Sequence, residues 1–110
     1  MKKLLIALLF APTMAHAEFM SGNDLLSKMT ADVMDKMYAL GYVIGVSDSV
    51  ENVTVCSPAN IKAGQVYDIV QNFLEANPAI RHHSADIIIR SKLEALWPCK
   101  QQGKSRGRGA

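Results

Sequence analysis

The side chains that could perform nucleophilic or metal chemistry are few, and their spacing does not favour either. Between residues 18 and 99 the chain has two cysteines, Cys56 and Cys99, and two adjacent histidines, His82 and His83. A nucleophile needs a base and an orienting group, yet no serine here lies in a nucleophile-elbow context. No third ligand is spaced to complete a metal site with the histidines, which we expect to point apart on a surface loop. The sequence therefore predicts no catalytic residue, no metal and no cofactor.

Residues 1–17 have the three parts of a secretory signal. Lys2 and Lys3 precede the apolar run 4–10, and Ala15-His16-Ala17 forms a cleavage site of small residues. The apolar run is shorter than the roughly 20 residues that span a bilayer, so no membrane insertion is expected. The alternative is a buried first helix of the domain. The signal predicts a periplasmic protein that begins near Glu18.

Export favours a disulfide between the two cysteines, because disulfides persist in oxidising compartments. No CxxC motif and no Cys-His spacing indicates a zinc site, which leaves a metal pair or a reactive thiol as the weaker alternatives. A Cys56–Cys99 disulfide would close a loop of 43 residues (99 − 56) and contribute on the order of 4 kcal/mol to stability.

Charge is divided unevenly along the chain. Residues 18–99 carry six basic and ten acidic side chains, a net charge of −4, whereas residues 100–110 carry four basic side chains and no acidic one. This segment has no large apolar residue and is predicted to be a disordered basic tail. Its single Arg-Gly-Arg-Gly run is weak evidence for nucleic-acid binding, and no nucleic-acid partner is expected.

Helical periodicity recurs between these ends, and strand-like alternation does not. We expect helices over about 22–29, from a Thr30 cap to about residue 50, over 62–76, and from a Ser84 cap to 96. The second helix is apolar on more than one side, so it should be central. The sequence thus predicts an all-α fold, a small bundle of about four helices with one disulfide, over residues 18–99.

Two glycines in the second predicted helix are expected to serve helix packing. Gly41 and Gly45 lie four residues apart, with Ser49 next on the same face. A glycine costs about 1 kcal/mol of helix propensity relative to alanine. We therefore expect a neighbouring helix to approach this bare face closely.

Three runs together resemble a known family. They are 41–48 (GYVIGVSD), Cys56-Ser-Pro with 64–70 (GQVYDIV), and 74–78 (LEANP) through Arg81-His82 to 97–99 (WPC). In this order and spacing, behind a signal, they resemble the Rap/Tai-type immunity proteins of type VI secretion systems. The resemblance covers roughly residues 20–100.

The resemblance implies a periplasmic, all-helical and often homodimeric protein that is not an enzyme. Such a protein binds a cognate peptidoglycan amidase effector, a papain-like Cys-His hydrolase, and blocks its groove. The chain departs from the family's pattern in lacking a second cysteine pair, with Met29 and Ala39 at those positions. Lys62 replaces a common threonine before the third helix, which makes Asn60 the expected cap.

Partner-binding residues are expected on the loops 48–52 and 77–83, because binding groups concentrate on loops held by a rigid scaffold. An alternative for one of them is an internal ion pair between Arg81 and Asp48. The predicted partner-binding residues are Asp48, Glu51, Asn52, Asn77, Arg81, His82 and His83.

Two other functions remain open from the sequence. A small, singly disulfide-bonded helical protein of the periplasm could be an acid-stress chaperone, which releases apolar surface when acidic groups are protonated. The chain could also be an orphan family member that binds another envelope protein.

Overall fold

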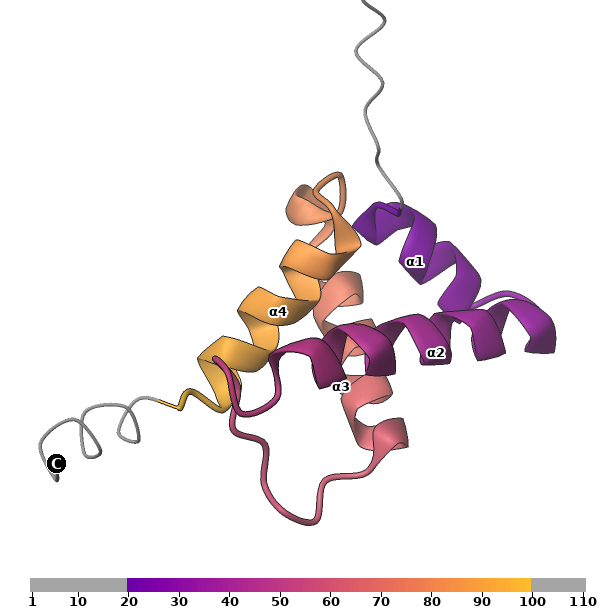
Figure 1. Cartoon of the computed structure of the whole chain (residues 1–110). Coiled ribbons are helices and arrows are strands. Elements are labelled where there is room, and N and C mark those ends of the chain that lie inside the picture. The colour runs from indigo at the N-terminus through magenta and orange to yellow at the C-terminus, as the bar shows by residue number, and fades with distance from the viewer. Residues whose placement is uncertain (1–19, 100–110) are drawn as a thin grey trace, which may run out of the picture.

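Four α-helices and one short 3-10 helix form the part of the chain that the structure describes (Figure 1). The computed structural model describes residues 20–99. The predicted signal (1–17) and basic tail (100–110) lie outside the described residues. The prediction of a small all-α bundle of about four helices with one disulfide is confirmed. The elements are α1 (Gly22–Met29), α2 (Val33–Val50), α3 (Ala63–Ala76), η1 (Pro78–Ile80) and α4 (Ala85–Leu96).

The longest helix, α2, is central, as the sequence predicted, and contacts α1, α3 and α4. Figure 1 shows α1 beside the first half of α2, α4 beside its last turns and α3 crossing behind it. One face of α2 supplies Ala39, Val43 and Val50 to the core. The remaining buried apolar residues are Met20, Leu25, Met29, Val55, Val66, Val70, Leu74, Ala85, Ile88, Ile89 and Leu93.

The first half of α2 is apolar but not covered. Val33, Met34, Met37 and Tyr38 are 70%, 75%, 61% and 58% exposed. The sequence indicated apolar surface on more than one side of this helix and suggested that other helices cover it. That interpretation is wrong for Val33, Met34 and Met37, which the other helices leave more than 60% exposed. The uncovered side chains form a surface that we call the α2 apolar face.

The expected packing role of Gly41 and Gly45 is also wrong. A Cβ placed on either residue would meet no atom within 4 Å, and both residues are exposed. The close approach occurs at Gly22, at the start of α1. There a Cβ would lie 2.7 Å from Ile88 Cδ1 and 2.9 Å from the Arg81 carbonyl oxygen.

Hydrogen bonds between residues three or four apart determine where α1 begins and ends and where α2 begins. Ser21 caps α1, since its Oγ accepts from the Asp24 N–H and the Asp24 carboxylate accepts from the Ser21 N–H. Thr30 ends α1 and does not begin α2, because its N–H and hydroxyl both donate to the Leu26 carbonyl oxygen. Asp32 caps α2 in its place, accepting from the Asp35 N–H at 2.9 Å.

The start of α3 differs from the expectation too. Lys62, and not Asn60, is the N-cap residue, although its side chain makes no cap hydrogen bond. The Gln65 side chain satisfies this end by accepting from the Lys62 N–H at 2.9 Å.

The disulfide joins the loop after α2 to the end of α4. Cys56 and Cys99 are bonded, with their Cα atoms 5.1 Å apart. The Cys56 N–H donates to the Trp97 carbonyl oxygen at 2.7 Å, and Val55 pairs with Pro98 in an isolated antiparallel bridge. No helix within residues 20–99 is long and apolar enough to cross a membrane.

Candidate functional site

The predicted partner-binding residues fall into two groups at opposite ends of α4. Asp48, Glu51 and Asn52 lie near the disulfide, which holds the end of α4. The second group lies between the end of α3 and the start of α4. A helix of 12 residues is about 18 Å long, so the two groups are not one contiguous site. The ion pairs among residues 20–99 are Lys28–Asp35 and Arg90–Asp86, so the alternative Arg81–Asp48 pair is wrong.

Beside the disulfide, Asp48 and Glu51 line a hollow of about 340 Å³, which we call the disulfide-end hollow. Glu51 accepts two hydrogen bonds from Ser57, from its N–H at 3.1 Å and from its hydroxyl at 2.7 Å. Asp48 is exposed, and neither carboxylate pairs with a cation among the described residues. Lys62 lines the same hollow, so its three charged groups sum to −1.

Asn52 has a structural role in the same loop. Its φ is 62°, in the left-handed region that asparagine tolerates better than most residues. Its N–H donates to the Val55 carbonyl oxygen at 2.7 Å. This turn directs the chain from the end of α2 toward the disulfide.

At the other end of α4, residues 81–84 form a turn that we call the histidine turn. The rings of His82 and His83 are 4.0 Å apart between centroids and tilted by 37°, so the expectation that they point apart is wrong. Both residues are exposed. No group of three or more metal-ligating side chains occurs within residues 20–99.

The backbone of the histidine turn is held by the start of α1. The Gly22 N–H donates to the His83 carbonyl oxygen at 2.9 Å, and the Asn23 N–H donates to that of Arg81 at 2.8 Å. On the other side of the turn, the Ala85 N–H donates to the Met20 carbonyl oxygen at 2.8 Å. Sequence reasoning missed this contact and Gly22's part in it, because one glycine after a helix cap carries no signal of a distant partner.

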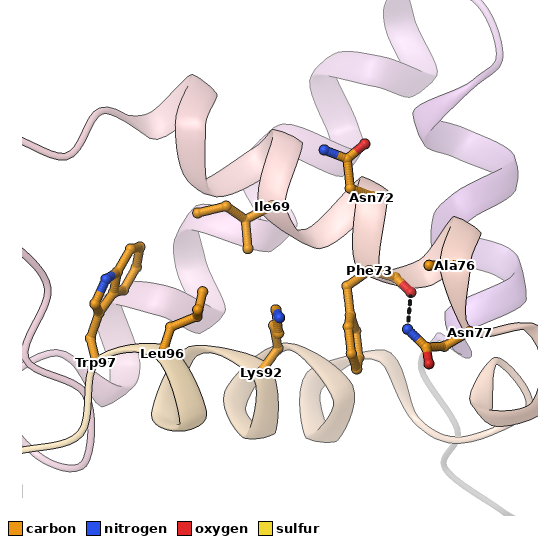
Figure 2. Close-up of a pocket in the computed structure, with 8 residues that line it drawn as sticks. All are labelled: Ile69, Asn72, Phe73, Ala76, Asn77, Lys92, Leu96 and Trp97. Atoms are coloured by element: carbon orange, nitrogen blue, oxygen red, sulfur yellow. Dashed lines mark hydrogen bonds between the residues drawn. The ribbon is translucent and has the colours of Figure 1, made fainter.

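Asn77, the remaining predicted residue, lies in an apolar groove between α3 and α4 of about 590 Å³ (Figure 2). Its side-chain amide donates to the Phe73 carbonyl oxygen at 2.8 Å, which caps the end of α3. Lys92 places its ammonium 4.9 Å from the centre of the Phe73 ring. The sequence suggested that the apolar row of α3 belongs to the core, yet Ile69 and Phe73 of that row are only partly buried, as is Trp97 across the groove.

An exposed face of α4 runs between the two predicted groups. His83, Ile87, Ser91 and Ala95 recur every four residues, and all are exposed. Ile87 is the large apolar residue among them. Because this row starts in the histidine turn and ends near the disulfide, we call it the α4 outer face.

The neighbouring side of α4 carries an ion pair. Arg90 donates to the Asp86 carboxylate at 3.2 Å, and the Ser84 hydroxyl donates to the same carboxylate. The Ser84 hydrogen bond, followed by the Arg90 hydrogen bond and charge, lowers the pKa of Asp86 below its ordinary value, against the opposing effect of burial. Burial, followed by the charge of Asp86, raises the pKa of Tyr42 on α2.

Comparison with known proteins gives a family. A search of the curated proteins finds no match to the chain. The family model of the Rap1a immunity proteins matches residues 21–99, from the cap of α1 to the second disulfide cysteine. The match covers all four helices and more than two thirds of the chain. The chain therefore belongs to the Rap1a immunity protein family, whose members are inhibitors and not enzymes.

Proposed function

We propose that this immunity protein acts in the periplasm, where it binds a peptidoglycan amidase delivered by a type VI secretion system and covers the groove that holds the amidase's catalytic residues. The family match over residues 21–99 is the observation that carries the proposal. The amidase and the secretion system come from the resemblance of the Gly-Tyr, Cys-Ser-Pro and Trp-Pro-Cys runs to the Rap/Tai-type proteins.

Two features support a periplasmic location. Residues 1–17 have the pattern of a secretory signal. The Cys56–Cys99 disulfide is stable in an oxidising compartment and rare in the cytosol.

Inhibition by occlusion requires a firm surface, and the α4 outer face meets this requirement. Ile87 is the large apolar side chain in its middle, and the histidine turn and the disulfide-end hollow lie at its ends. Apolar anchors surrounded by polar residues carry most of the energy in protein interfaces. We propose that Ile87 is the anchor and that the predicted residues of both loops form the rim.

We further propose that the chain is a homodimer through the α2 apolar face. Val33, Met37 and Leu40 line a hollow of about 280 Å³ with Tyr67 of α3. A contiguous exposed apolar patch is unusual on a monomer and is typical of an interaction surface. A second copy is the occupant that the family resemblance implies.

The test is an inhibition assay with the amidase encoded beside the gene. An equimolar mixture should lose peptidoglycan hydrolysis, and the two proteins should co-purify from periplasmic extract. Normal hydrolysis in that mixture, with no complex on size-exclusion chromatography, contradicts the proposed function.

A pair of variants tests the surface. Ile87→Asp should weaken amidase binding at least tenfold, about 1.4 kcal/mol, because a carboxylate replaces the apolar anchor. Ser27→Ala, an exposed change on α1, is the control and should bind like the parent protein. Equal affinities for the two variants, measured by calorimetry, would remove the α4 outer face from the interface.

A further inference from the structure

We propose that two copies of the chain pair α2 against α2 in an antiparallel arrangement, in which the large side chains of each copy's first half enter a hollow beside the glycines of the other copy's second half. The proposal rests on the homodimer proposed above and specifies its register. One stripe of exposed residues along α2 carries both parts, because its members are spaced four, three and four positions apart. They are Met34, Tyr38, Gly41 and Gly45.

The hollow lies beside the two glycines, between α2 and α4. Its volume is about 370 Å³, and its lining includes Gly41, Gly45 and Ser49 of α2 with Asp86 and Arg90 of α4. A Cβ placed on either glycine would meet no atom within 4 Å, so no packing within residues 20–99 requires a glycine there. Glycine disfavours a helix interior, and its usual benefit is to let another backbone approach closely. A second polypeptide on this face would provide that backbone.

A second copy of the chain fits this face because the stripe is complementary to itself. In a two-fold dimer, residue i contacts residue j of the partner subunit, and residue j contacts residue i. The step from Tyr38 back to Met34 is four residues, as is the step from Gly41 forward to Gly45. An antiparallel pair with Tyr38 opposite Gly41 of the partner subunit therefore also has Met34 opposite Gly45 of the partner subunit. A parallel pair would instead place large side chains against large ones and leave the glycines facing each other.

Tyr38 is already held in place for such a contact. The ammonium of Lys28, on α1, lies 4.8 Å from the centre of the Tyr38 ring and 3.6 Å from the Asp35 carboxylate. Tyr38 nevertheless remains 58% exposed. A large exposed side chain that is fixed before binding loses little conformational entropy in an interface, which favours its use as an anchor.

The charges beside the stripe support the antiparallel register. Asp35 and Tyr42 lie two helical turns apart on one flank of α2, and Tyr42 lines the hollow with Asp86. The Lys28–Asp35 ion pair thus flanks the first half of the stripe, and the Asp86–Arg90 ion pair flanks the second half on the same side. Figure 1 shows α1 and α4 beside these two halves of α2.

An antiparallel two-fold keeps this flank of both copies on one side of the helix pair. It therefore brings Arg90 toward Asp35 of the partner subunit, and Lys28 toward Asp86 of the partner subunit. Opposite charges meet at both ends of the helix pair in this register. Such complementarity contributes more to the choice of register than to affinity, which the apolar contacts supply.

Interchain disulfide trapping tests the register. Chains with Met34→Cys and with Gly45→Cys are prepared separately, with the Cys56–Cys99 disulfide intact, and are then mixed under mild oxidation. The mixture should give at least ten times more linked dimer than either chain alone, and peptide mapping should join residue 34 to residue 45.

Each chain alone is a control for the direction of the pair. In the proposed register, the two copies of residue 34 are offset by 11 residues (45 − 34) along the helix axis, roughly 16 Å. A disulfide needs Cα atoms within about 7 Å, so the Met34→Cys chain should not link to itself. Met34→Cys mixed with Ser91→Cys, which changes an exposed residue of the α4 outer face, should also give no link.

A substitution that fills the hollow tests the contact without new cysteines. Gly45→Leu should raise the dissociation constant of the dimer at least tenfold, because leucine occupies the space proposed for Met34 of the partner subunit. The monomer should retain its fold, since Gly45 has open space around it. Ser91→Leu adds the same side chain to an exposed position of α4 and should leave the dissociation constant unchanged. Sedimentation equilibrium measures both constants, and circular dichroism measures the helicity of each variant.

Two results would overturn the register and leave the proposed homodimer in place. They are a self-link of the Met34→Cys chain as strong as its link to the Gly45→Cys chain, which indicates a parallel pair, and an unchanged dissociation constant for Gly45→Leu. A parent protein that stays monomeric at all concentrations would overturn both the register and the homodimer. None of these experiments contains an amidase, so each result is independent of whether the chain inhibits one.

Discussion

Among the residues, Gly22 has the tightest surroundings of the glycines in the described chain. An added Cβ would meet the Ile88 side chain at 2.7 Å and the Arg81 backbone at 2.9 Å. The Ile88 side chain can rotate, but the Arg81 carbonyl oxygen is held by the Asn23 N–H. Gly45 is the opposite case, since it lies in an exposed helix with open space around it.

The two glycines therefore give opposite predictions. Gly22→Ala should lower the free energy of unfolding by about 1–3 kcal/mol, because the contact between α1 and the histidine turn must open. Gly45→Ala should raise it by up to about 1 kcal/mol, because alanine favours the helix. Urea denaturation at a concentration where the chain is monomeric measures both. A destabilising Gly45→Ala would mean that another segment packs on that face.

Asp86 gives a prediction on pH. Its pKa in the folded chain is lowered from 3.8, chiefly by the Ser84 hydrogen bond. A lowered folded pKa means that Asp86 contributes stability above that ordinary value, and that the contribution is lost as the pH falls through the folded pKa. The Asp86 side chain is 42% exposed, so solvent screening limits this contribution to at most about 1 kcal/mol.

Asp86→Asn should accordingly lower the melting temperature at neutral pH, and the difference from the parent protein should shrink below about pH 4. Glu94→Gln, a carboxylate of the same helix without a hydrogen bond or ion pair among the described residues, is the control. Thermal unfolding followed by circular dichroism across this pH range measures the effect. A difference that is constant with pH would exclude the ion pair as its cause.

At the scale of the elements, the sequence predicted the helices better than their faces. The expected third helix, 62–76, and the fourth, to 96, agree with α3 and α4 to within one residue at each end, because Pro78 and Pro98 follow them closely. The face of α2 could not be deduced, since its apolar residues lie on several sides and only packing decides which are covered. The same ambiguity led to the wrong interpretation of Gly41 and Gly45.

The exposed part of α2 gives a prediction on assembly. Met37→Lys should convert a dimer to a monomer, because it places a charge in the α2 apolar face, while leaving helicity unchanged at a residue 61% exposed. Val53→Lys changes a residue 69% exposed in the loop after α2 and is the control. Sedimentation equilibrium measures both variants. A monomeric parent protein at all concentrations would contradict the proposed dimer.

For the whole molecule, the disulfide is the main constraint on the unfolded chain. It closes a loop of 43 residues that contains α3, η1 and α4. Loop-closure entropy makes this worth on the order of 4 kcal/mol. Small domains have a net stability of about 5–15 kcal/mol, so the disulfide is a large share of it.

The double variant Cys56→Ser/Cys99→Ser should therefore unfold at a much lower denaturant concentration than the oxidised parent protein. Adding a reductant should reproduce this loss in the parent protein and have no effect on the variant. Guanidinium denaturation followed by circular dichroism measures the difference. Equal denaturation midpoints for the variant and the oxidised parent protein would show that the disulfide does not contribute to stability.

The sequence predicted the disulfide and the fold class at this scale, but it could not locate a site. Asp48 and Arg81 were offered as partners, yet Asp48 lies in the last turn of α2, near the end of α4, and Arg81 lies in the loop before the start of α4. Hydrophobic periodicity within one element does not show where a residue of another element lies relative to it. The α3–α4 groove was missed for a related reason. Ile69 and Phe73 lie in the same apolar row as Val66 and Val70. Only the position of α4 decides that the two valines are buried in the core while Ile69 and Phe73 line the groove.

The backbone hydrogen bonds between the start of α1 and residues 81–85 have a consequence for the speed of recognition. A turn whose carbonyl oxygens already accept hydrogen bonds loses little conformational entropy when another molecule binds to it. Any protein that meets His82 and His83 should then associate without a slow rearrangement step, at a rate set by orientation alone, about 10⁵–10⁷ M⁻¹s⁻¹. A substitution of Gly22 that weakens these hydrogen bonds should therefore lower the association rate, even though it leaves both histidines in place.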